Sequence, residues 1–299
     1  MQELFPNEEK NMNGLRRKKQ MAITLRKLSE FSEIEQLEEM EGKIWDPSSA
    51  IPHHMTLTMQ KFGGLFLGAF DDEKMIGFLY SFPGFTNGEP HLCSHMLGFL
   101  PEYRKQGLGV QMKWLQKEEA AAAGYSKITW TYDPLETVNG VLNIAKLGGI
   151  VRTYLPNCYG QLDDDFNRGL PTDRFLVEWL IGSDRVESRQ AGNNSTPSLE
   201  HAPDLLRLEI KDGIPHPIEI DLSREEPILL LPVPAFFQDV KRADMTVASM
   251  WREMTRELFT AYFAKGYVVT NILRDQSTVR YVLEKQPLTD ILSASSSLS

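Results

Sequence analysis

The sequence predicts a mixed α/β protein, in which helices cover the faces of a sheet, with a smaller α+β unit toward the C-terminus. Two observations carry this prediction. Strand-like and helix-like apolar patterns alternate through residues 21–182. A second set of such patterns follows a polar segment at residues 183–203. A chain of 299 residues has enough material to build both cores.

Composition excludes several classes of partner. The net charge of −9 and the pI near 5.3 argue against nucleic acid and anionic membranes, since both recruit basic surfaces. Cys93 and Cys158 have neither C-x-x-C spacing nor a nearby cluster of metal ligands, so we expect reduced thiols and no metal. No run of about 18 apolar residues and no apolar N-terminal segment occurs. We therefore expect a cytoplasmic protein that binds a small molecule.

The first unit begins with a strand at 21–28 and a helix at 29–45, for which Ser29 is the expected cap. Two apolar runs around the turn "DDEK" predict a hairpin, and "PGFTNGEP" reads as a loop before a strand at 91–100. A helix at 110–123 should end at Gly124, which suits a C-cap. The remaining elements expected here are a strand at 127–132, a helix at 137–147, and strands at 150–155 and 173–181.

The second unit is expected at 204–288, after the linker 183–203, which is rich in Ser, Asn, Gly and Pro. One helix at about 242–265 carries an apolar stripe that includes Trp251 and Phe259, so we expect a buried stripe in an extension that packs on the first unit or shapes the substrate site. Residues 1–20 and 289–299 are polar or low in complexity, and we expect disordered tails there. The strands expected in this unit are 205–210, 216–222, 227–234, 267–274 and 279–285.

The most informative short segment is "LPEYRKQGLGVQMK", in which two glycines stand at a turn between a strand and a helix. Glycines let backbone N–H groups approach a ligand, and a helix start presents unpaired N–H groups with a partial positive charge. Arg104 and Lys105 add positive charge beside Gln106 and Leu108. The segment therefore predicts a cradle for a phosphate group, formed by residues 104–109.

This order of strand, "RKQGLG", helix and strand resembles the GNAT superfamily of acyl-CoA-dependent N-acyltransferases. Arg104, Gly107 and Gly109 match the R/Q-x-x-G-x-G/A signature of that family. The resemblance spans about residues 23–181 and implies a twisted, largely antiparallel mixed sheet. Segments such as "NRGLPTDRFLVEWL" are further similar to a branch with a C-terminal extension, some members of which resemble amino-acid N-acyltransferases.

The resemblance also implies ligands and roles. Acyl-CoA, either acetyl-CoA or succinyl-CoA, would place its pyrophosphate in the cradle and its pantetheine arm along Leu97 to Phe99. The backbone N–H of Leu97 would hold the thioester carbonyl, and Asn139 is a further contact expected for the cofactor. The acceptor would be a small-molecule amine, most readily an amino acid. Assembly as a homodimer is left open.

One family position departs from the pattern. The tyrosine that usually protonates the leaving thiolate falls at Ile144. Tyr159, Tyr154 or solvent could supply the proton instead, although a tyrosine near a strand end often serves packing. The alternative reading is a non-catalytic module of GNAT fold that binds acyl-CoA or a protein.

Other side chains are candidates for contact with the acceptor. His95 titrates near neutral pH and could act as the base, although a strand histidine is often structural. Asp133 follows a strand and could hold an ammonium group, or could simply form an Asp-Pro turn. Arg168 and Arg174 could bind a carboxylate of the acceptor or of a succinyl-type acyl group, or form surface ion pairs.

Overall fold

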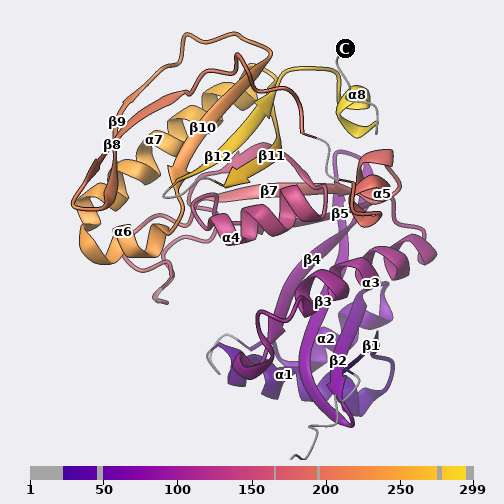
Figure 1. Cartoon of the computed structure of the whole chain (residues 1–299). Helices are drawn as coiled ribbons and strands as arrows, with labels where there is room; N and C mark the ends of the chain where they lie inside the picture. The colour runs from indigo at the N-terminus through magenta and orange to yellow at the C-terminus, as the bar shows by residue number, and fades with distance from the viewer. Residues whose placement is uncertain (1–22, 46–49, 165, 194–195, 275–277, 294–299) are drawn as a thin grey trace, which may run out of the picture.

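The computed structural model describes residues 23–45, 50–164, 166–193, 196–274 and 278–293. Ten strands form one sheet in the order β1-β2-β3-β4-β5-β7-β6-β11-β12-β10, and β8 pairs with β9 in a separate hairpin (Figure 1). The strands are β1 Ile23–Lys27, β2 Leu65–Asp71, β3 Lys74–Thr86, β4 Glu89–Phe99, β5 Lys127–Tyr132, β6 Ile150–Leu155, β7 Arg174–Leu180, β8 Leu206–Lys211, β9 Ile214–Ile220, β10 Ile228–Pro234, β11 Val268–Arg274 and β12 Thr278–Glu284.

Helices lie on both faces of the sheet, which confirms the predicted mixed α/β class. The helical elements are α1 Phe31–Ile44, α2 His53–Lys61, the short 3-10 turn η2 Pro101–Tyr103, α3 Leu108–Ala122, α4 Thr137–Gly140, the π-helical segment η3 Val141–Lys146, α5 Asp184–Gln190, α6 Phe237–Ala243, α7 Met245–Ala264 and α8 Leu288–Leu292.

Alternation along β2 separates the two faces of its part of the sheet. Phe66 and Phe70 pack in one cluster with apolar residues of α1, whereas Leu65 and Leu67 pack in another with Leu108 and other residues of α3. Successive side chains of a strand point to opposite faces, so α1 and α3 cover opposite sides of this sheet. We call these the α1 face and the α3 face.

Among the neighbouring strands of the described sheet, only β4 and β5 run parallel. Their pairing is confined to Leu92 with Ile128 and Cys93 with Thr129. β4 continues to Phe99 and β5 to Tyr132, but neither pairs with the other beyond these positions. The two strands therefore form a fork whose closed end lies at Cys93 and Thr129.

The C-terminal strands extend the same sheet. β11 joins β6 through the pair Val269 and Val151, and α7 packs its stripe of Trp251, Leu258 and Phe259 into a core shared with β6 and β7. Figure 1 shows α7 beside β12 and β10. The expected division into units at 21–182 and 204–288 stays a prediction, but the two parts share one sheet and one core.

Several element boundaries differ from the sequence expectations. "PGFTNGEP" belongs to a hairpin, since β3 reaches Thr86 and turns at Asn87 and Gly88, whose φ angles are 53° and 82°. Asn-Gly favours such a turn, so the loop expected here was wrong. The helix expected at about 242–265 is α7, which starts at Met245 because the Asp244 side chain accepts hydrogen bonds from Thr246 N and Val247 N and caps it; the separate helix α6 ends just before, at Ala243.

Caps and ends also required correction. Helix α1 starts after Glu30, and the Glu33 side chain accepts a hydrogen bond from Glu30 N at 3.2 Å, so Ser29 is not its cap. The linker 183–203 contains α5. The tail expected at 289–299 begins with part of α8, in which Ile291 is buried beside Ile150 and Val268. Residues 1–20 lie outside the described residues.

Candidate functional site

The cradle stands where the sequence placed it, between β4 and α3. Gly107 has φ 79° and is the N-cap of α3, and a Cβ atom added to it would meet nothing within 4 Å. Lys105 also has a left-handed φ of 63°, which is uncommon for a residue other than glycine. Two left-handed residues in one short turn direct several backbone N–H groups into the space before the helix.

Those N–H groups have no internal partner. Across the described residues, the backbone amides of 105–109 donate to no carbonyl or side chain, and the first amides with partners are those of Val110 and Gln111, on Gly107 O. The Gln106 amide side chain bonds to Glu102 O at 3.2 Å, and Arg104 Nε donates to Phe99 O at 2.9 Å. Arg104 thus ties the cradle to the end of β4 while its side chain remains exposed.

A β-bulge interrupts β4 on the way from the cradle to the closed end of the fork. Tyr80 pairs with Met96 and Ser81 with Ser94, which leaves His95 as the extra residue. Leu97 resumes the regular pairing, with Leu79, and its side chain contacts the α3 face. The bulge therefore re-aims the backbone between the expected thioester contact, Leu97, and the closed end of the fork.

His95 lies on the α1 face. Its ring centre is 5.7 Å from those of both Tyr80 and Phe82. Although the side chain remains accessible from one side, these neighbours exclude part of its water and so lower the pKa of His95. A neutral imidazole at neutral pH can accept a proton, as the predicted role requires.

The candidate proton donors differ in burial and in hydrogen bonding. Ile144 is fully buried in η3 and offers no proton. Tyr159 is 49% exposed, and its hydroxyl is 2.6 Å from Thr131 Oγ1 of β5. Tyr154 is buried and donates to Asp173 Oδ2 at 2.7 Å, and burial raises its pKa. Asn139 is exposed on α4.

Asp133 belongs to a buried ion cluster at the end of β5. Its carboxylate accepts two hydrogen bonds from Arg252 of α7, one of them 2.9 Å long, and another from Leu135 N. Arg174 Nη1 lies 3.7 Å away. Burial lowers the pKa of Arg252, but the Asp133 carboxylate outweighs it, and the pKa ends above its ordinary value. These contacts correct the picture of Asp133 as a free carboxylate for an ammonium group.

The two arginines predicted to bind a carboxylate are also engaged. Arg174 is buried and donates to Asp173 O and to Asn167 Oδ1. Arg168 is exposed and pairs with Asp163 at 2.6 Å. Arg168 thus forms a surface ion pair, as in the alternative reading, whereas Arg174 is held in buried contacts; binding of a carboxylate by either residue stays a prediction.

Sequence reasoning missed a buried polar group at the closed end of the fork. Lys113 and Gln116 of α3 contact Ser94 of β4 there. The signal was available, since Lys113 and Gln116 lie between Met112 and Ala120, two apolar positions that pack on the sheet. Arg252 and Arg256, which pair with Asp133 and Asp173, were missed because they lie more than 80 residues away in the sequence.

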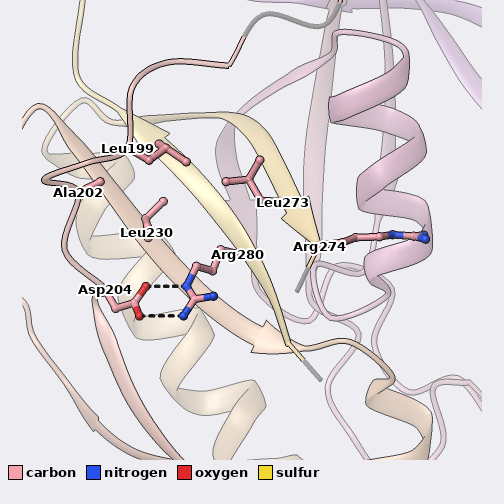
Figure 2. A pocket seen from close by; sticks show the side chains of 7 residues that line it. All are labelled: Leu199, Ala202, Asp204, Leu230, Leu273, Arg274 and Arg280. Atoms are coloured by element: carbon pink, nitrogen blue, oxygen red, sulfur yellow. Dashed lines mark hydrogen bonds and ion pairs between the residues drawn. The ribbon is translucent and has the colours of Figure 1, made fainter. Parts of the chain in front are cut away.

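A separate hollow of about 480 Å³ lies in the C-terminal part, beside β10, β11 and β12. The Asp204 carboxylate accepts hydrogen bonds from Arg280 at 3.0 and 3.3 Å, while Arg274 points away from this pair (Figure 2). The charges of Asp204 and Arg280 thus compensate each other. Its lining is Leu199, Ala202, Asp204, Leu230, Leu273, Arg274 and Arg280, none of which belongs to the cradle or the fork.

Across the described residues, a cluster of metal ligands and a membrane-spanning helix are both absent. No group of three or more His, Cys, Asp and Glu side chains in them could hold a metal ion. None of their helices combines the length and the apolar character that crossing a membrane requires.

Comparison with known proteins finds similarity in the N-terminal part of the chain. The model of the acetyltransferase (GNAT) family matches residues 30–139. No curated protein matched the sequence. Similar solved structures include a GNAT-family acetyltransferase from Streptococcus pneumoniae, with 18% identity, a TM-score of 0.44, and coverage of 54% of this chain and 100% of that one.

Two other solved structures are similar over the same share of the chain. A GNAT-family acetyltransferase from Elizabethkingia anophelis with acetyl-CoA bound has 18% identity and a TM-score of 0.41, covering 53% of this chain and 97% of its own. The ribosomal-protein-S18-alanine N-acetyltransferase from Escherichia coli has 16% identity and a TM-score of 0.43, covering 54% and 94%. Residues 30–139 are thus similar to the GNAT acetyltransferase family, and the segment with Arg104, Gly107 and Gly109 lies inside the matched range.

Proposed function

We propose that the protein is an acyl-CoA-dependent N-acyltransferase that acts on the amine of a small metabolite, most readily an amino acid. The observation that carries the proposal is the set of backbone amides at 105–109, which have no hydrogen-bond partner among the described residues, next to open space at Gly107. The pyrophosphate of coenzyme A carries negative charge, and it would accept hydrogen bonds from these amides at the positive end of the helix.

The fork offers a path from the cradle into the sheet. β4 has a free edge toward β5 between Ser94 and Phe99, because the two strands pair only at Leu92 and Cys93. The amide groups of a pantetheine arm can pair with such an edge as an additional strand does. The Leu97 N–H would then polarise the thioester carbonyl.

The transfer requires that the C–S bond of the thioester breaks as a C–N bond to the acceptor forms. One proton leaves the amine and one reaches the thiolate. His95, on the α1 face at the bulge, would take the first. Tyr159 is the accessible hydroxyl beside β5 and would give the second.

A second candidate function is a non-catalytic acyl-CoA-binding or protein-interaction module. The observation that favours it is the buried Ile144 at the family's usual tyrosine position. A non-catalytic module would bind coenzyme A but would not turn over acyl-CoA. The free thiol of coenzyme A is only mildly acidic, so loss of one acid does not by itself prevent transfer.

A thiol-release assay separates the two functions. Acetyl-CoA and succinyl-CoA are each presented with a panel of L- and D-amino acids and simple amines, and coenzyme A affinity is measured by calorimetry in parallel. Acceptor-dependent release of thiol supports the enzyme. Tight binding without release against any acceptor would favour the module, and the absence of binding would overturn both.

A further inference from the structure

Lys113 is an unusual residue for the interior of a domain. It is 4% exposed, and across the described residues no carboxylate lies within ion-pair distance of its ammonium group. Nζ donates to Gln116 Oε1 at 2.7 Å and to Ser94 Oγ at 3.3 Å, and it lies 3.6 Å from the centre of the Trp130 ring. Burial lowers the pKa of Lys113 well below its ordinary value. Burial without a counter-charge disfavours the ammonium form, so a negatively charged ligand beside Lys113 would supply what this position lacks.

Its position is specific to the fork. The last paired residues of the two strands are Cys93 of β4 and Thr129 of β5. Lys113 contacts the next residue of each strand, namely Ser94 and Trp130. The ammonium group therefore occupies the closed end of the fork, on the α3 face.

Helix α3 runs back along β4 from the cradle to this point. A Cβ atom at Gly109 would lie 4.0 Å from Leu97 Cδ2, whereas Lys113 and Gln116 contact Ser94. Four helical residues advance about 6 Å. An acyl chain that continued along β4 from a thioester at Leu97 toward the closed end of the fork would reach Lys113.

We infer that Lys113 recognises an acyl group that ends in a carboxylate, so that the donor is a dicarboxylic acyl-CoA of the succinyl type. This inference rests on the proposed function. The bond to Ser94 is long for an ammonium donor, and a carboxylate beside Ser94 would supply the missing counter-charge. The distal carboxylate takes no part in the bond exchange, which occurs at the thioester carbon.

The test compares succinyl-CoA with butyryl-CoA, which has the same carbon chain and no distal carboxylate. In the full-length protein we expect succinyl-CoA to bind roughly 10- to 100-fold more tightly, as a charge-assisted hydrogen bond provides. Lys113→Met should remove this preference and should bind both donors alike. Lys117→Met is the matched control, because Lys117 lies one turn further along α3 and pairs with Glu187 instead.

The outcomes are separable. Failure of free coenzyme A to bind would overturn the proposed function itself. Coenzyme A binding with equal affinities for succinyl-CoA and butyryl-CoA would overturn only the role of Lys113. The comparison of succinyl-CoA with butyryl-CoA uses the unsubstituted protein, so it tests the inference even if Lys113→Met fails to fold. Loss of the preference in Lys117→Met as well would also contradict the inference.

Discussion

The carboxylate of Asp133, at the end of β5, accepts hydrogen bonds from both terminal nitrogens of Arg252 in α7. This pair joins the strand that forms one arm of the fork to a helix of the C-terminal part, and Arg252 is only 2% exposed. The role of the Asp133–Arg252 pair is therefore to fix the edge of the candidate site to the rest of the sheet.

Replacing Arg252 by alanine should destabilise the protein by about 3 kcal/mol, because it leaves the Asp133 carboxylate buried beside a more distant Arg174. Urea denaturation measures the change. Arg242→Ala, which removes the exposed partner of Asp239, should cost less than about 0.5 kcal/mol. Equal effects of the two substitutions would show that the buried pair has no special role.

Gly107→Glu should abolish coenzyme A binding, since it places a carboxylate where the amides of the cradle would receive phosphate. Gly124→Glu is the matched control, because Gly124 follows the other end of α3 with φ 88° and has equally open surroundings. Both variants carry similar backbone strain, so only the first should lose affinity in calorimetry. A folded Gly107→Glu protein with unchanged affinity would rule out the cradle.

The acid limb of the pH profile should report on His95. The surroundings of His95 lower its pKa, so the imidazole stays neutral to a more acidic pH than in water. As the pH is lowered, kcat/KM should therefore decrease with a midpoint below about pH 6.5. His95→Gln should abolish this limb and reduce kcat/KM roughly 100-fold. Persistence of the same limb in the variant would assign the base elsewhere.

Tyr159→Phe should lower kcat by roughly 10- to 1000-fold and leave coenzyme A affinity intact, if its hydroxyl protonates the thiolate. Tyr154→Phe is the contrasting variant. It removes a buried hydrogen bond to Asp173 and should cost about 1 kcal/mol of stability without a comparable loss of turnover. Wild-type kcat in Tyr159→Phe would leave solvent or Tyr154 as the proton source.

The sequence by itself determined the local features of this protein. Alternating and helical apolar patterns predicted most strands and helices, and the spacing of Arg104, Gly107 and Gly109 between a strand and a helix predicted the cradle. These signals are local, because a turn conformation or an amphipathic face depends on residues a few positions apart. The Asn87-Gly88 turn depends on a local signal as well, because Asn-Gly favours a two-residue hairpin turn.

Tertiary structure decided what depends on distant partners. Asp133 and Arg252 are 119 positions apart, and no sequence pattern in either segment predicts that they pair. Lys113 reads as an ordinary helix lysine until packing places its ammonium group between Ser94 and Trp130. Whether a charged side chain is solvated, paired or held for a ligand is set by the elements that surround it, and these meet only when the chain has folded.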